Sequence, residues 1–201
     1  MFKVLLLELD GVLRFWDPTL TEAVEASYGL PAGALALAAF APHRFDPALT
    51  GTIDDQTWRE SVARNLSLDD VDTARAAVQA WMGPVGRVDP DVLDVVRLAR
   101  TTVRVVLLTN ATNRLQDDLE RLGLTDEIDD AMSSAQLGLA KPDPDVFSRA
   151  ALRNGLMFSE IAYVDASPVN IATAEILGIR SHRYVGVDEF RTFVDDVLID
   201  A

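Results

Sequence analysis

Short apolar segments recur along the chain, and each of them ends at a polar residue or a glycine. They cover residues 4–9, 103–108, 161–164 and 181–185. Between them, apolar residues recur at helical spacing over residues 90–100, 112–122, 143–153 and 168–177. Strands that alternate with helices predict an α/β fold in which a parallel sheet forms the core.

Residues 14–86 interrupt this alternation, because their apolar positions follow a helical period throughout. The pattern predicts helices over residues 19–28, 32–39, 53–65 and 70–81, with Thr52 as the N-cap of the third. We therefore expect a small helical bundle that is inserted after the first strand of a Rossmann-like sheet. The predicted division is an α/β core of residues 1–13 and 87–201 and an α-helical cap of residues 14–86.

Polar side chains follow three of the predicted strands at the point where each strand ends. In a parallel sheet the carboxyl ends of the strands lie along one edge, and ligands bind outside that edge. The sequence therefore predicts a site at this edge, beneath the cap. The side chains expected there are Glu8, Asp10, Thr109, Asn110 and Asp165.

Composition narrows the classes of partner. The net charge of −14 argues against nucleic acid, because phosphate backbones are bound by clustered Lys and Arg. The chain has no cysteine, so a metal would be held by oxygen or by His43 and His182, and oxygen ligands favour Mg²⁺. No apolar stretch reaches the roughly 20 residues that cross a bilayer, and the first apolar run is too short for a signal peptide. We expect no membrane partner and a cytoplasmic location.

Four motifs, in order along the chain, carry a resemblance to a known family. Residues 8–13 read ELDGVL at the end of the first strand, and residues 107–110 read LLTN at the end of the second. Residues 141–147 read KPDPDVF and begin with one of only two lysines, and residues 163–170 read YVDASPVN. Together with the inserted helices, these motifs resemble the haloacid dehalogenase (HAD) superfamily of hydrolases, in its phosphatase-like branch with a helical cap after the first strand.

The resemblance implies a Mg²⁺-dependent phosphomonoester phosphatase and gives each motif a role. It implies a carboxylate nucleophile at Glu8, a general acid and base at Asp10 and a charge clamp at Lys141. Thr109 and Asn110, together with Lys141, are implied to bind the phosphate of a small phosphorylated metabolite.

The resemblance also implies a magnesium site at Glu8, Asp10 and Asp165, but the sequence departs from the family pattern at two positions. Glu8 stands where the family has Asp, and its extra methylene moves the attacking oxygen by about 1 Å, a displacement that can cost roughly 10²-fold in rate. Ala166 stands where the family has an acid that contacts the metal. Because Mg²⁺ demands near-octahedral oxygen ligands, both changes are expected to weaken its binding.

Two functions remain open, and a third fits less well. The first is a HAD-like hydrolase, ancestrally a phosphomonoester phosphatase, whose activity is weak or altered because Glu8 and Ala166 replace the expected Asp residues. The alternative is a catalytically inactive HAD-fold protein that binds a phosphorylated ligand or partner. A dehalogenase fits less well, because that branch also uses the nucleophilic Asp and usually lacks an acid at the position of Asp10. A monomer and a homodimer are both compatible with the sequence.

Some conspicuous side chains have a structural explanation. Arg44 is expected in a solvated loop of the cap, and Asn170 is expected to cap a helix rather than to support the site. Of the three tryptophans, Trp16 alone is close enough in sequence to the strand ends to face a ligand. Trp58 and Trp81 are expected to pack within the cap or against the core.

Overall fold

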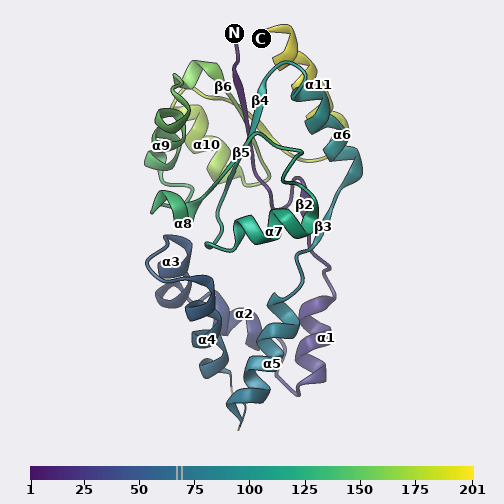
Figure 1. Cartoon of the computed structure of the whole chain (residues 1–201), viewed down its shortest axis with the longest axis vertical. Helices are drawn as coiled ribbons and strands as arrows, with labels where there is room; N and C mark the ends of the chain where they lie inside the picture. Colours follow the sequence, from purple (N-terminus) through teal and green to yellow (C-terminus); the bar gives the residue numbers. More distant parts are fainter. Residues whose placement is uncertain (67, 69) are drawn as a thin grey trace.

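A five-stranded parallel sheet in the order β5-β4-β1-β6-β7 forms the core of the protein (Figure 1). The computed structural model describes residues 1–66, 68 and 70–201, so Ser67 and Asp69, in the predicted cap, lie outside the described residues. The strands are β1 (Val4–Leu7), β4 (Arg104–Thr109), β5 (Asp130–Ser133), β6 (Ile161–Asp165) and β7 (Arg180–Arg183). The predicted α/β fold with a parallel sheet and inserted helices is confirmed.

Strand β1 is central, because it pairs in parallel with β4 on one side and with β6 on the other. Its side chains alternate between the two faces of the sheet. Leu5 and Leu7 belong to one buried cluster, whereas Val4 and Leu6 belong to the other. A strand that is covered on both faces reads as a continuous apolar run, and this is why the first segment of the sequence is apolar throughout.

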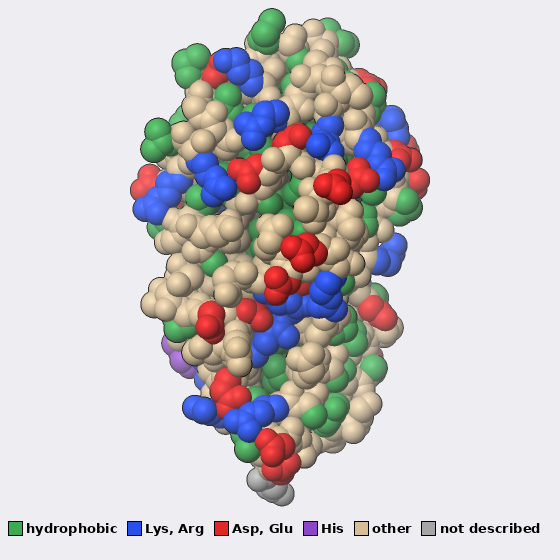
Figure 2. All heavy atoms as spheres, in the orientation of Figure 1, with side chains coloured by type: hydrophobic (Ala, Val, Ile, Leu, Met, Phe, Trp, Pro, Cys, Tyr) green, Lys and Arg blue, Asp and Glu red, His purple; other side chains and the backbone are tan. Residues whose placement is uncertain are grey.

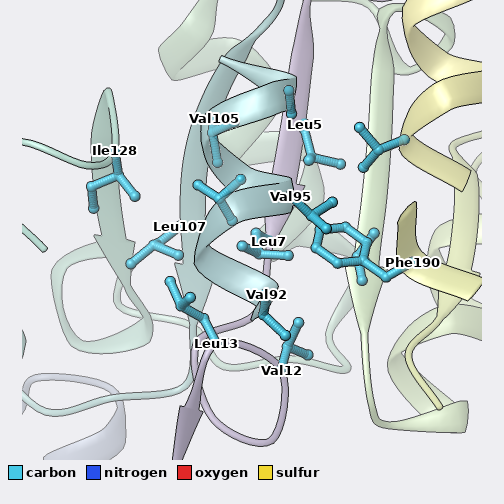
Figure 3. Close-up of a cluster of buried hydrophobic side chains, with 14 of the residues drawn as sticks. Leu5, Leu7, Val12, Leu13, Val92, Val95, Val105, Leu107, Ile128 and Phe190 are labelled. Carbon is cyan, nitrogen blue, oxygen red and sulfur yellow. The ribbon is translucent and has the colours of Figure 1, made fainter. Parts of the chain in front are cut away.

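Helices cover both faces of the sheet. The cluster around Leu5 and Leu7 is closed by α6 (Pro90–Ala99), α7 (Leu115–Leu122) and α11 (Val187–Ile199) (Figure 3). The opposite cluster is closed by α8 (Ser134–Leu137), α9 (Pro144–Asn154) and α10 (Pro168–Ile176). Burial of one Leu or Phe side chain contributes about 1.5–3 kcal/mol. The two clusters therefore hold the strand ends, and the polar residues that follow them, in fixed positions.

In the described part of the cap the chain forms five helices, which lie beyond the carboxyl ends of the strands (Figure 1). They enclose a third buried cluster that includes Leu35, Trp58 and Val62. The helices are α1 (Leu20–Ser27), α2 (Ala34–Ala39), α3 (Pro42–Leu49), α4 (Asp55–Asn65) and α5 (Val71–Met82). No helix in the described part of the chain combines the length and the apolar character that a bilayer crossing needs.

Two local expectations for the cap are wrong. The N-cap of α4 is Asp54 rather than Thr52, because the Asp54 carboxylate accepts the backbone N–H of Thr57 at 2.7 Å. The expected loop after Pro42 is helix α3, which has this proline in its first turn. Arg44 stabilises the helix by donating to the carbonyl of Ala38 at 2.8 Å, so its side chain is not that of a solvated loop.

A short antiparallel ladder links the cap to the core. Strand β2 (Arg14–Phe15) leaves the core and pairs with β3 (Arg87–Val88), which returns to it. The predicted boundaries at residues 13/14 and 86/87 fall at this ladder. Further contacts fasten the cap to the edge of the sheet: the Asp55 carboxylate accepts the Thr112 hydroxyl at 2.9 Å, and its backbone N–H donates to Asn113 at 2.8 Å.

Candidate functional site

The site begins with the carboxylate of Glu8, which follows strand β1 and is 7 % exposed. One of its oxygens, Oε1, accepts the hydroxyl of Thr109 and the backbone N–H groups of Leu9 at 2.8 Å and Asp10 at 3.2 Å. The other, Oε2, accepts the ammonium of Lys141. The side chain of Glu8 therefore folds back onto its own strand end, and both of its oxygens accept hydrogen bonds from protein donors.

Lys141 lies between two acids. Its ammonium contacts Glu8 and lies 2.8 Å from Oδ2 of Asp165, and it also donates to the carbonyl of Leu108 at 2.7 Å. Its hydrogen bond to the hydroxyl of Tyr163 measures 3.1 Å. Lys141 is 4 % exposed, so a single buried cation serves two buried carboxylates. Such a cluster is stable only while each charge keeps its partner.

Asn110 fixes the segment that carries Lys141. Its side-chain amide donates to the carbonyl of Lys141 and accepts the backbone N–H of the same residue, both at 2.8 Å. These two bonds tie the end of β4 to the turn before α9. In this structure Asn110 thus orients the lysine backbone, which is a supporting contact that the sequence did not specify.

Asp165 has more partners than the sequence indicated. Its carboxylate accepts the amide of Asn170 at 2.8 Å, the backbone N–H of Ser167 at 2.7 Å and the hydroxyl of Tyr163. Ser167, not Asn170, caps helix α10, so the expected capping role of Asn170 is wrong. Tyr163 was missed because its position inside an apolar strand is also that of an ordinary core residue.

The two acids beside Lys141 differ in how easily they ionise. Burial raises the pKa of Glu8 above its ordinary value, and the nearby Lys141 ammonium only partly offsets this. Burial also opposes ionisation of Asp165, but the Lys141 cation and the hydrogen bonds around that carboxylate bring its pKa below the ordinary value. Asp165 is therefore the firmer anion of the pair.

Asp10 is turned toward the cap and away from Lys141. Both of its oxygens accept the guanidinium of Arg14, at 2.7 and 2.8 Å, and one also accepts the indole N–H of Trp16 at 2.8 Å. Arg14 is 3 % exposed, and its remaining nitrogen donates to Asp118 at 2.9 Å. Arg14 carried no prediction, although an arginine four residues after an acid and directly after two apolar residues can signal a buried ion pair.

The structure does not bring the predicted magnesium ligands Glu8, Asp10 and Asp165 into one group. Among the described residues, no cluster of three or more acids or histidines has the geometry of a metal site. The physical reason is that Glu8 and Asp165 face the ammonium of Lys141, whereas Asp10 faces Arg14. Ala166, which supplies no oxygen, lies at the same edge, 3.6 Å from the point that a Cβ on Gly11 would occupy. The residues present therefore do not fit a magnesium ion.

A cavity of about 340 Å³ lies between the cap and the sheet, and we call it the cap cavity. Asp10, Asn110 and Thr112 line its core side, but Glu8 and Lys141 do not reach it. The prediction that only Trp16 faces ligand space is wrong, because Trp58 and Trp81 line the cavity as well. Five aromatic rings line it in total: Trp16, Phe40, Phe45, Trp58 and Trp81.

Comparison with protein families matches residues 2–178 to the model described as haloacid dehalogenase-like hydrolase. Comparison with curated protein sequences gives no match.

Several solved structures share the fold. A HAD family enzyme, BT-2542 from Bacteroides thetaiotaomicron, is 20 % identical, with a TM-score of 0.78 over 96 % of this chain and 98 % of that one. The same enzyme in complex with magnesium and inorganic phosphate gives a TM-score of 0.69 at 20 % identity, over 91 % of this chain and 94 % of that one. A 2-haloacid dehalogenase from Pseudomonas syringae pv. Tomato DC3000 is 22 % identical, with a TM-score of 0.66 over 92 % and 86 % of the two chains. At these identities the likeness is one of fold.

Proposed function

Because the chain belongs to the haloacid dehalogenase-like hydrolase family, its expected chemistry is hydrolysis that begins with attack by a carboxylate nucleophile, and we propose that this member binds a ligand beneath its cap without catalysing Mg²⁺-dependent phosphoryl transfer. The proposal concerns three elements of that chemistry: the nucleophile, the proton donor and the metal.

The observation that carries the proposal is the position of the Glu8 carboxylate. It accepts the Thr109 hydroxyl, the N–H groups of Leu9 and Asp10 and the Lys141 ammonium. By resemblance, a hydroxyl, backbone N–H groups and a lysine of this kind would hold the oxygens of a phosphoryl group. Glu8 thus fills the anion site with its own carboxylate. An attack by Glu8 would first break these bonds, and each hydrogen bond to a charged group contributes about 1.5–3 kcal/mol.

The pairing of Asp10 supports the same conclusion. A general acid and base must give a proton to the leaving oxygen and later remove one from water. Both oxygens of Asp10 are held by the fork of Arg14, a bidentate geometry that is among the stronger ion pairs in proteins. Proton transfer from this carboxylate would require the fork to open.

The third element is the metal, which the motif resemblance implies; the HAD family enzyme BT-2542, which shares this fold, has solved structures in complex with magnesium. Mg²⁺ is held by carboxylate oxygens and waters in octahedral geometry, and in phosphoryl transfer it neutralises the charge on the phosphate. In this chain the buried positive charge between Glu8 and Asp165 is the ammonium of Lys141. We therefore assign no step of a reaction to a metal.

A weak or altered phosphomonoester phosphatase is the second candidate. One observation favours it: at the carboxyl end of the sheet, Thr109 and Lys141 each donate a hydrogen bond to the carboxylate of Glu8. Such a hydrolase needs Glu8 to release these donors when a phosphorylated metabolite arrives.

The experiment that separates the two candidates is an aryl phosphate assay with Mg²⁺ on four proteins: wild type, Glu8→Asp, Ala166→Asp and the double variant. We expect no product from the wild type above the buffer rate. The double variant should give slow but measurable product, because the shorter acid frees the anion site and Asp at position 166 adds a metal ligand, while the Arg14 pair on Asp10 stays in place and limits the rate. Addition of Asp10→Asn to the double variant is the matched control and should abolish its activity. Steady turnover by the wild type would refute the proposal, whereas an inactive double variant would refute the explanation from these two positions.

A further inference from the structure

Five aromatic side chains line the cap cavity, and several of their rings pack against one another. Phe40 packs edge-on against Phe45 at a centroid distance of 5.2 Å and against Trp81 at 5.9 Å. Phe45 lies 5.1 Å from Trp58 with its ring tilted by 38°. We propose that this cavity binds an uncharged aromatic molecule of about two rings. The inference rests on the proposed function, since it names the class of ligand that the protein holds beneath its cap.

The tryptophans that line the cavity need no hydrogen bond from a ligand. The indole N–H of Trp16 donates to Asp10 at 2.8 Å, that of Trp58 to the carbonyl of Ala39 at 3.1 Å, and that of Trp81 to the hydroxyl of Thr21 at 2.9 Å. With their polar ends satisfied inside the protein, the rings present apolar faces to the cavity. Aromatic faces bind other aromatic rings in stacked or edge-on geometry.

The charged residues of the cavity argue for a ligand without charge. Each arginine of its described lining already has a carboxylate partner: Arg14 pairs with Asp10 and Asp118, Arg114 lies 2.7 Å from Asp118, and Arg59 pairs with Asp55. An anionic ligand would have to displace one of these carboxylates. A cationic ligand would have to displace one of the guanidinium groups, except at Asp17, a lining acid whose described partner is Thr19: one carboxylate oxygen accepts the backbone N–H and the hydroxyl of that residue. The net charge of −14 further opposes an anion. Figure 2 shows the same mixture outside, where acidic and basic side chains lie interspersed on the visible face.

Size and exposure support the same class of ligand. A cavity of about 150 Å³ holds one benzene molecule, so about 340 Å³ is sufficient for two rings. Two of the lining residues keep much of their surface in water: Trp16 is 42 % exposed and Phe40 is 51 % exposed. A bound aromatic molecule would cover part of this apolar surface, and its removal from water favours binding.

The test compares three naphthalene probes that differ only in charge: 2-naphthalenemethanol, 2-naphthoate and 2-naphthylmethylammonium. Calorimetry measures binding to the full chain without Mg²⁺ or phosphate. Tryptophan emission reports the location, because all three tryptophans of the chain line this cavity. We expect the alcohol to bind at least about tenfold more tightly than either ion, since burial of an unpaired charge is costly. Preference for the naphthoate, preference for the ammonium, or no binding of the alcohol would each overturn the inference.

Two variants locate the binding. Ala111→Phe fills the cavity from its core side and should weaken the alcohol about tenfold or more, whereas Ala76→Phe, the same change on the exposed face of α5, should leave binding unchanged. Phe40→Ala removes an exposed ring and should weaken binding severalfold without unfolding the cap. If Ala111→Phe does not fold, Phe40→Ala decides, and unchanged affinity in that variant would refute the site.

The calorimetry and the aryl phosphate assay fail independently. Binding of the alcohol by a protein that also turns over an aryl phosphate would refute the proposed function and leave the ligand class standing. Absence of both binding and turnover would refute the ligand class and leave the lack of phosphoryl transfer standing.

Discussion

Replacement of Lys141 by Met is the sharpest test of the buried charge cluster. The change keeps an unbranched side chain of similar length but removes the cation that contacts both Glu8 and Asp165. Two carboxylates, 7 % and 2 % exposed, are then left without a counter-ion. Loss of one partner from a buried ion pair costs about 3–5 kcal/mol, because the remaining charge stays desolvated. We expect a loss of this size in the free energy of unfolding at neutral pH.

The assay is urea unfolding followed by far-UV circular dichroism, with the other lysine of the chain as the matched control. Lys3→Met removes an ion pair with Glu160 in which the lysine side chain is 57 % exposed, and exposed pairs contribute about 0–1 kcal/mol. Glu8→Gln in the Lys141→Met background should restore part of the stability, since it removes one of the two unpaired charges. A loss below about 1 kcal/mol for Lys141→Met, equal to that of the control, would refute the view that this lysine neutralises the cluster.

Three further outcomes follow from the site and the cap. The raised pKa of Glu8 means that the folded protein binds the Glu8 proton more tightly than the unfolded chain does. This stabilisation is complete below the unfolded pKa of 4.5 and is lost as pH rises through the folded pKa. Across this pH range, the free energy of unfolding should therefore fall in the wild type relative to Glu8→Gln, and a difference that stays constant with pH would contradict this. Gly51→Ala should cost at least about 1 kcal/mol more than Gly33→Ala in thermal unfolding. Both residues have positive φ, but a Cβ added at Gly51 would clash with the backbone carbonyl of Ala135, whereas one added at Gly33 meets open space. Equal losses would mean that the cap and core do not touch there in solution. Chelation of divalent metals with EDTA should leave the melting temperature unchanged. A metal bound only by the folded state would stabilise it, so a fall in melting temperature on chelation would reveal a metal site.

The sequence by itself determined the architecture and the order of the polar residues along the sheet edge. Apolar periodicity is a local property, so the central strands, the helices around them and the inserted cap could be predicted from short windows. Strand β5 was missed because it is only four residues long and begins at Asp130, at the end of an acidic run, rather than in an apolar segment. The N-cap of α4 was misplaced for a similar reason, since several neighbouring residues can cap a helix.

The tertiary structure alone decided where the carboxylates point. Glu8 faces Lys141, 133 positions away in the chain, and Arg14, the partner of Asp10, also pairs with Asp118, 104 positions after Arg14. The direction of a buried charge is set by its long-range partner, because an unpaired charge is too costly inside the protein, and no local pattern contains that information. The cap cavity arose in the same way: Trp58 and Trp81 read as ordinary core residues of helices, and only the docking of the cap onto the sheet turned their faces into the wall of one cavity.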